Sequence, residues 1–168
     1  MIRKVDYVEW VPARLVDPRA AKIEQIIHGM EQIIAAEGPV MASRVFRIFS
    51  RAGGLSRIYD ETRRSFLRAL RTALDKRILV AEEEASEDPA TWILRLPSQE
   101  RVRVRTLGSR TLHEVPAAEV AEIMLEIRVA TELISREELF RKVLAEYGLT
   151  RLTEATTNRL DYILMTWF

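Results

Sequence analysis

The sequence matches itself when it is shifted by 94 positions. Residues 21–74 then superimpose on residues 115–168 without a gap. The best-matched stretch is Gly54-Leu55-Ser56-Arg57-Ile58, which falls on Gly148-Leu149-Thr150-Arg151-Leu152. Apolar positions coincide through most of the overlay, and a fixed internal period is the signature of a repeated structural unit. We therefore expect two copies of one small unit.

Each copy contains three segments with helical periodicity. In the first copy, apolar residues recur at spacings of three and four within about 20–36, 42–52 and 60–76, which predicts three amphipathic helices. Gly38-Pro39 ends the first helix and Gly53-Gly54 ends the second. The residues expected to face the core are Ile23, Ile26, Ile27, Met30, Ile33, Ile34, Val45, Phe46, Phe49, Phe66, Leu67, Leu70, Ala73 and Leu74.

A β-rich region follows the third helix of the first copy. Residues 78–80 and 91–94 are strand-like runs that flank the polar stretch 82–89, a pattern that predicts a β-hairpin. Three helices followed by a hairpin is the order of a winged helix, a relative of the helix-turn-helix in which the third helix usually reads the DNA groove. The predicted fold is mostly α with a small β-hairpin, as tandem winged-helix-like repeats.

These patterns predict four segments along the chain. Residues 1–19 are expected to be an N-terminal arm packed on the body, and residues 20–97 the first winged-helix-like domain. Residues 98–116 are expected to be a linker, in which the alternating run 101–105 could form an exposed strand that pairs with the first hairpin. Residues 117–168 are the second winged-helix-like domain, without a wing.

Composition removes several classes of function. The 168 residues include no cysteine and only two histidines, His28 and His113, so we expect no disulfide, no metal site and no cofactor. The N-terminus has no apolar signal region and no window is long enough to span a bilayer, which favours a cytoplasmic protein without a membrane role. Neither a phosphate loop nor a Gly-x-Ser-x-Gly elbow occurs, so we expect no catalytic residue and no enzyme.

Positive charge is concentrated in the first copy. Residues 38–77 contain ten basic and three acidic residues, whereas residues 132–168 contain five basic and six acidic ones. Arginine stripes on the second and third helices would suit the phosphate backbone and the groove of double-stranded DNA. The alternative is that these arginines are only solvated surface charge. The candidate DNA-binding residues are Arg44, Arg47, Arg51, Arg57, Arg63, Arg64, Arg68 and Arg71.

The second copy replaces the arginine stripe with other residues. Asn158, Tyr162 and Met165 stand where the first copy has arginines, with Trp167 and Phe168 nearby. An exposed apolar patch made of Tyr162, Met165, Trp167 and Phe168 would indicate a protein interface or a homodimer contact. The alternative is that these residues pack against the rest of the chain.

Several short motifs also resemble a known family. Glu37-Gly38-Pro39-Val40 and Gly54-Leu55-Ser56-Arg57, followed by Val102-Arg103-Val104-Arg105 and Val115-Pro116-Ala117-Ala118-Glu119, resemble a winged-helix-like domain of unknown function. That domain occurs, in tandem, in the C-terminal part of certain bacterial superfamily 1 helicases. The resemblance implies a DNA-handling context with a helicase or nuclease partner, and it does not imply ATPase activity.

Two functions are therefore expected from the sequence. The first is a non-catalytic DNA-binding accessory module of a nucleic-acid-processing system that uses the basic helices of the first repeat. The second is a protein–protein interaction or oligomerisation module that docks a helicase or nuclease partner, or a second copy of itself.

Overall fold

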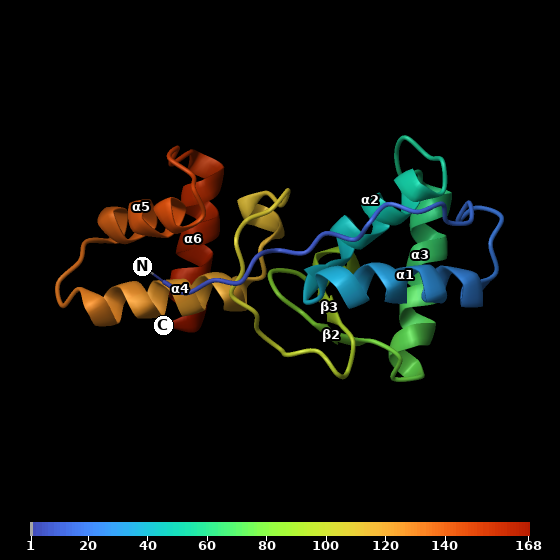
Figure 1. Cartoon of the computed structure of the whole chain (residues 1–168), viewed down its shortest axis with the longest axis horizontal. Coiled ribbons are helices and arrows are strands. Elements are labelled where there is room, and N and C mark those ends of the chain that lie inside the picture. Colours follow the sequence, from blue (N-terminus) through green and yellow to red (C-terminus); the bar gives the residue numbers. More distant parts are fainter. Residues whose placement is uncertain (1) are drawn as a thin grey trace. The chain divides into compact units, whose positions relative to one another are not determined.

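The protein is mostly helical. The computed structural model describes residues 2–168, which form six α-helices and one small three-stranded antiparallel sheet (Figure 1). This confirms the predicted mostly α class with a small hairpin, and it is compatible with a winged-helix-like fold. The described residues divide into two compact units, residues 8–101 and residues 2–7 together with Val102–Phe168. No helix within residues 2–168 has the length and apolar character that a membrane span requires.

The first unit, residues 8–101, contains three helices and the sheet. Its elements are α1 (Ile23–Glu37), β1 (Val40–Met41), α2 (Ala42–Ala52), α3 (Asp60–Asp75), β2 (Val80–Glu82), the 3-10 turn η1 (Pro89–Thr91) and β3 (Ile93–Arg95). β3 is the central strand, and its Leu94 stands opposite Val40 of β1 and Ala81 of β2. The predicted hairpin is therefore present as β2 and β3, whereas β1 was not expected.

The core of the first unit follows the predicted helix faces. α1 packs against α2 and α3, and the ring of Phe66 on α3 stacks on Phe46 at a centroid distance of 4.8 Å and meets Phe49 edge-on. These aromatic contacts join α2 to α3 through buried apolar area. Two predicted core residues of α3, Leu67 and Leu74, are only partly buried, and Ile23 of α1 is exposed.

The second unit contains the other three helices. They are α4 (Ala117–Ala130), α5 (Arg136–Glu146) and α6 (Glu154–Trp167), preceded by the 3-10 turn η2 (Leu112–Glu114). These helices begin 94 residues after the first residues of α1, α2 and α3. α4 packs against α5 and α6. The Ser135 side chain caps α5 by accepting a hydrogen bond from the backbone N–H of Glu138.

The segment predicted as a linker belongs largely to the second unit. From Val102 onward it packs there, and Arg105 forms a parallel bridge with Val5 of the N-terminal segment. The exposed strand expected over residues 101–105, paired with the first hairpin, is therefore not found. The predicted arm is divided as well, because residues 2–7 lie in the second unit and residues 8–19 in the first; its first residue, Met1, lies outside the described residues.

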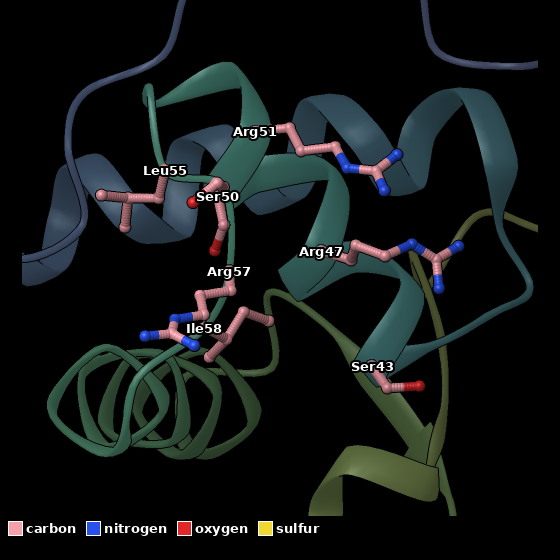
Figure 2. Close-up of a pocket in the computed structure, with 8 residues that line it drawn as sticks. Ser43, Arg47, Ser50, Arg51, Leu55, Arg57 and Ile58 are labelled. Carbon is pink, nitrogen blue, oxygen red and sulfur yellow. The ribbon is translucent and has the colours of Figure 1, made fainter.

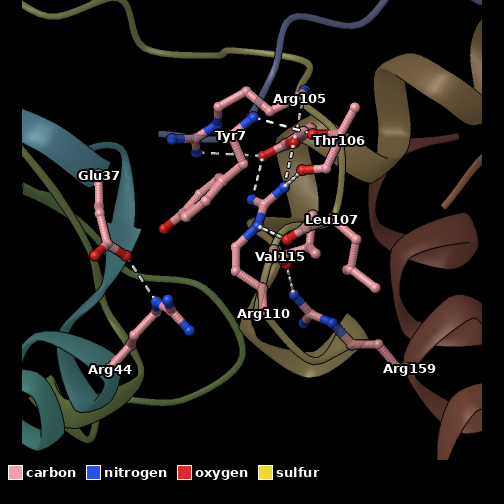
Figure 3. A network of polar contacts seen from close by, with 10 residues as sticks. Tyr7, Glu37, Arg44, Arg105, Thr106, Leu107, Arg110, Val115 and Arg159 are labelled. Atoms are coloured by element: carbon pink, nitrogen blue, oxygen red, sulfur yellow. Dashed lines mark hydrogen bonds and ion pairs between the residues drawn. The ribbon is translucent and has the colours of Figure 1, made fainter. Parts of the chain in front are cut away.

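A buried charged cluster holds this segment to α4. The Glu119 carboxylate accepts hydrogen bonds from the Arg105 backbone N–H at 2.9 Å and from Arg110 Nη1 and Nη2 at 2.9 and 3.0 Å. The Tyr7 ring faces both guanidinium groups, with its centroid 4.9 Å from Cζ of Arg105 and 4.3 Å from Cζ of Arg110 (Figure 3). Burial lowers the pKa of Arg105 below its ordinary value, while the nearby Glu119 charge acts in the opposite direction. Two buried cations thus depend on one carboxylate.

Candidate nucleic-acid interface

Three of the predicted DNA-binding arginines form an exposed stripe on α3. Arg64, Arg68 and Arg71 are all exposed, and none of them forms an ion pair within residues 2–168. Their spacing of four and three residues places them on one helix face, while Phe66 and Leu70 on the other side are buried. The α3 stripe, defined as Arg64, Arg68 and Arg71, therefore presents three unneutralised guanidinium groups to solvent.

Arg44 does not belong to this surface. Its side chain is 5% exposed, and its Nε donates a 2.8 Å hydrogen bond to the Glu37 carboxylate, which is 2% exposed (Figure 3). Glu37 also accepts a hydrogen bond from the backbone N–H of Trp10. Because the guanidinium is buried and paired, the expectation that Arg44 contacts a phosphate does not fit its position. The pair instead ties the end of α1 to the start of α2.

Arg63 is only partly available. Its guanidinium forms an ion pair with Asp88, and both side chains are partly exposed. The pKa of Asp88 is lowered, first by the hydrogen bond that it accepts from the Ala90 backbone N–H and then by Arg63. This contact joins α3 to the turn before η1, and it neutralises part of the positive charge that the sequence placed on the helix.

The remaining three predicted arginines line a pocket between α2 and the turn that follows it. Arg47 and Arg51 come from α2, and Arg57 comes from the turn (Figure 2). The cavity measures about 330 Å³. Its lining residues are Ser43, Arg47, Ser50, Arg51, Leu55, Ser56, Arg57 and Ile58. We call it the α2-turn pocket.

The turn itself closes the pocket because of its glycines. Gly54 has a positive φ of 89°, a conformation that favours glycine over residues with a side chain. The chain reverses there, and the Leu55 N–H donates to the carbonyl of Ser50 at 2.8 Å. Since Leu55 is also buried, the start of the turn is held against the end of α2.

The pocket hydroxyls were not anticipated from the sequence. Ser43, Arg47 and Ser50 are spaced by four and three residues, which puts them on one face of α2. Ser50 is only 1% exposed, and its Oγ has no hydrogen-bond partner among the described residues. The spacing of Ser43, Arg47 and Ser50 is visible in the sequence. The prediction of the site rested on arginines alone and therefore did not include the serines.

Acidic residues gather in the hairpin rather than on the helices. Glu82, Glu83, Glu84, Glu87 and Asp88 are all exposed or partly exposed between β2 and η1. Carboxylates repel phosphate groups, so this hairpin is unsuited to contact with a nucleic-acid backbone.

The predicted protein-interface residues of the second unit differ in exposure. Met165 is 83% exposed, Trp167 42% and Phe168 48%, and the guanidinium of Arg128 lies 5.0 Å from the Phe168 ring centroid. Tyr162, in contrast, packs against the buried core of α4, α5 and α6. The exposed patch on the second unit therefore consists of Met165, Trp167 and Phe168, without Tyr162.

No group of three or more histidine, cysteine, aspartate or glutamate side chains in residues 2–168 is arranged to hold a metal ion.

Comparison of the chain with protein families, with curated proteins and with solved structures finds no match in any of the three.

Proposed function

We propose that this chain is a non-catalytic, cytoplasmic DNA-binding accessory module of a nucleic-acid-processing system. The observation that carries the proposal is the α3 stripe, in which Arg64, Arg68 and Arg71 are exposed together without acidic partners. α3 follows α2 after a short turn, which is the arrangement that places a recognition helix in the major groove of DNA. Arginine suits this role because it can contact phosphates and guanine edges.

The proposed surface is narrower than the one expected from the sequence. It comprises the α3 stripe together with Arg51 and Arg57, which are exposed, and Arg47, which is partly exposed. The buried Arg44 is left out because it is paired with Glu37. The acidic hairpin supports contact through the helices rather than through the wing.

The arrangement of the helices supports a tandem duplication, with one unit basic and the other not. α4, α5 and α6 begin 94 residues after α1, α2 and α3. Gly148, which is 94 residues after Gly54, also has a positive φ. The sequence resemblance described above supports placing such a tandem module beside a bacterial helicase or nuclease.

Fluorescence anisotropy with a labelled DNA duplex at increasing salt tests the DNA-binding proposal. Each lost phosphate contact reduces the slope of log affinity against log salt by about 0.9, so replacing all three stripe arginines with glutamate should reduce it by about 2.7. The matched control places three glutamates on the second unit, at Arg141, Lys142 and Arg151, which are also exposed. Equal binding by the stripe variant and the control variant would contradict the proposal.

The exposed patch on the second unit favours a second candidate function, contact with another copy of this chain. Large apolar side chains that stay in solvent mark interaction sites, and Met165 and Trp167 are examples. Sedimentation velocity should then show a concentration-dependent dimer that Trp167→Glu weakens. Val11→Glu is the control, because Val11 is an exposed apolar residue of the first unit. A wild-type chain that stays monomeric at high concentration would exclude this candidate.

A further inference from the structure

The α2-turn pocket combines a buried, unsatisfied hydroxyl with a concentration of positive charge. Ser50 lines the pocket, and its Oγ has no hydrogen-bond partner among residues 2–168. Buried polar groups are almost always hydrogen-bonded, so each exception calls for an explanation. A ligand in the pocket that accepts a hydrogen bond from Ser50 would supply one.

The charges around the pocket select an anion as that ligand. Arg47, Arg51 and Arg57 all line it, and arginine remains protonated at any physiological pH. None of the eight lining residues carries a carboxylate. Ser43 and Ser56 add two more hydroxyl donors beside the guanidinium groups of Arg51 and Arg57.

The C-terminal end of α2 lies beside the pocket, and its last carbonyl groups are hydrogen-bonded, so they do not repel an anion as free carbonyl groups would. The carbonyls of Phe49, Ser50 and Arg51, at the end of α2, accept backbone N–H groups from Gly53, Leu55 and Gly54 at 2.9, 2.8 and 3.1 Å. Arg51 and Arg57 are exposed, and exposed side chains change rotamer on picosecond to nanosecond timescales. Their guanidinium groups can therefore turn toward a bound anion, and Arg57 does so from a position over the Tyr59 ring, whose centroid lies 4.8 Å from its Cζ.

We propose that the α2-turn pocket binds a phosphate monoester. A monoester carries a charge of about −1.5 to −2 at pH 7 and three acceptor oxygens, which matches the two guanidinium groups of Arg51 and Arg57 better than the single charge of an internal diester does. A cavity of about 330 Å³ is at the lower end of the range for small-molecule sites and exceeds what the phosphate group alone needs. The ligand is either the phosphorylated end of a nucleic-acid strand or a free phosphate compound such as a mononucleotide. The proposal stands whether or not the α3 stripe binds duplex DNA.

The first experiment titrates the whole chain with inorganic phosphate while ¹H–¹⁵N NMR spectra are recorded. We expect saturable shifts of the Ser50 and Leu55 amides and of the Arg51 and Arg57 Nε–H groups at pH 7.5. Binding should weaken at pH 5.5, because inorganic phosphate is then mostly the monoanion, whereas the dianion predominates at pH 7.5, and the arginines keep their charge at both pH values. The absence of saturable shifts at these residues would overturn the proposal.

Variants then separate this pocket from the α3 stripe. Ser50→Ala removes a hydroxyl that makes no hydrogen bond within residues 2–168, so the fold should be retained. Phosphate affinity should fall roughly tenfold or more because a hydrogen bond to a charged group is lost. Arg51→Gln should give a similar loss. The control Arg71→Gln lies on the α3 stripe and should bind phosphate like the wild type while it weakens duplex binding. Unchanged phosphate affinity in both Ser50→Ala and Arg51→Gln would contradict the pocket assignment.

A final comparison distinguishes the two sources of the phosphate group. A short duplex with a 5′-phosphate should bind more tightly than the same duplex with a 5′-hydroxyl, and Ser50→Ala should abolish the difference. If the two duplexes bind equally while inorganic phosphate still binds at the pocket, the ligand is a free phosphate compound. If Arg71→Gln loses duplex binding but still binds phosphate, the α3 stripe binds DNA independently of the α2-turn pocket.

Discussion

Replacing Glu119 with glutamine should destabilise the second unit strongly. In the structure one carboxylate serves two guanidinium groups and one backbone N–H, with Arg105 and Glu119 each only 1% exposed and Arg110 4%. Glutamine keeps the shape but removes the negative charge that faces both buried guanidinium groups. Removing one partner of a buried ion pair typically costs about 3–5 kcal/mol. That is a large part of the roughly 5–15 kcal/mol by which a domain is usually stable.

Thermal unfolding and hydrogen exchange both measure this cost. For a domain of 60–100 residues each kcal/mol lowers the melting temperature by about 4–8 °C, so a decrease of about 12–40 °C is expected for Glu119→Gln. The slowest-exchanging amides of α4 and α6 report the free energy of opening directly. Glu122→Gln is the control, because Glu122 is exposed on the same helix. A Glu119→Gln variant within about 1 kcal/mol of the control would refute the reasoning about uncompensated burial.

Three further predictions concern single residues. Burial raises the pKa of Tyr147, and its hydroxyl has no hydrogen-bond partner in residues 2–168. Because the folded protein disfavours the charged phenolate, the stability linked to the neutral Tyr147 is complete below pH 10 and is lost as the pH rises further. Tyr147→Phe should remove this alkaline loss in pH-dependent urea unfolding and change the stability at neutral pH by less than about 1 kcal/mol. Gly54→Ala should lower the free energy of unfolding by about 1–2 kcal/mol because the φ of Gly54 is positive, although the added methyl group would meet no atom within 4 Å. An unchanged melting temperature in thermal unfolding would show that the turn relaxes. Glu37→Gln should destabilise the first unit by about 3 kcal/mol or more, since Arg44 stays buried. Chemical denaturation followed by tryptophan fluorescence, with Trp10 and Trp92 in this unit, checks this.

The helices could be predicted from the sequence because local signals define them. Gly54 and Gly148 end the turns after α2 and α5, and apolar spacing identified the buried face of α1. β1 escaped prediction because its two residues are fixed by pairing with β3, more than fifty positions away. Strand pairing over such a distance leaves no periodic pattern in the short segment itself.

The sequence predicted which arginines carry the positive charge of the candidate site, but it did not predict which acidic residues pair with them. The spacing of Arg64, Arg68 and Arg71 was sufficient to place them on one exposed face. Arg44 looked equivalent, but Glu37, which neutralises it, belongs to the preceding helix and is brought near only by the fold. Arg105 illustrates the same limit, since an alternating run suggested an exposed strand while Glu119 and Tyr7 hold the side chain inside. Sequence spacing reveals faces within one element but not contacts between elements.

The placement of residues 2–7 in the second unit has a consequence for synthesis. Tyr7 contacts Thr106 and Arg110, which are translated about 100 positions after it. At roughly 5–20 residues per second, the nascent segment waits about 5–20 seconds for these partners to be translated. The second unit therefore cannot be assembled from residues 102–168 alone, because residues 2–7, which are translated before the whole of the first unit, are part of it.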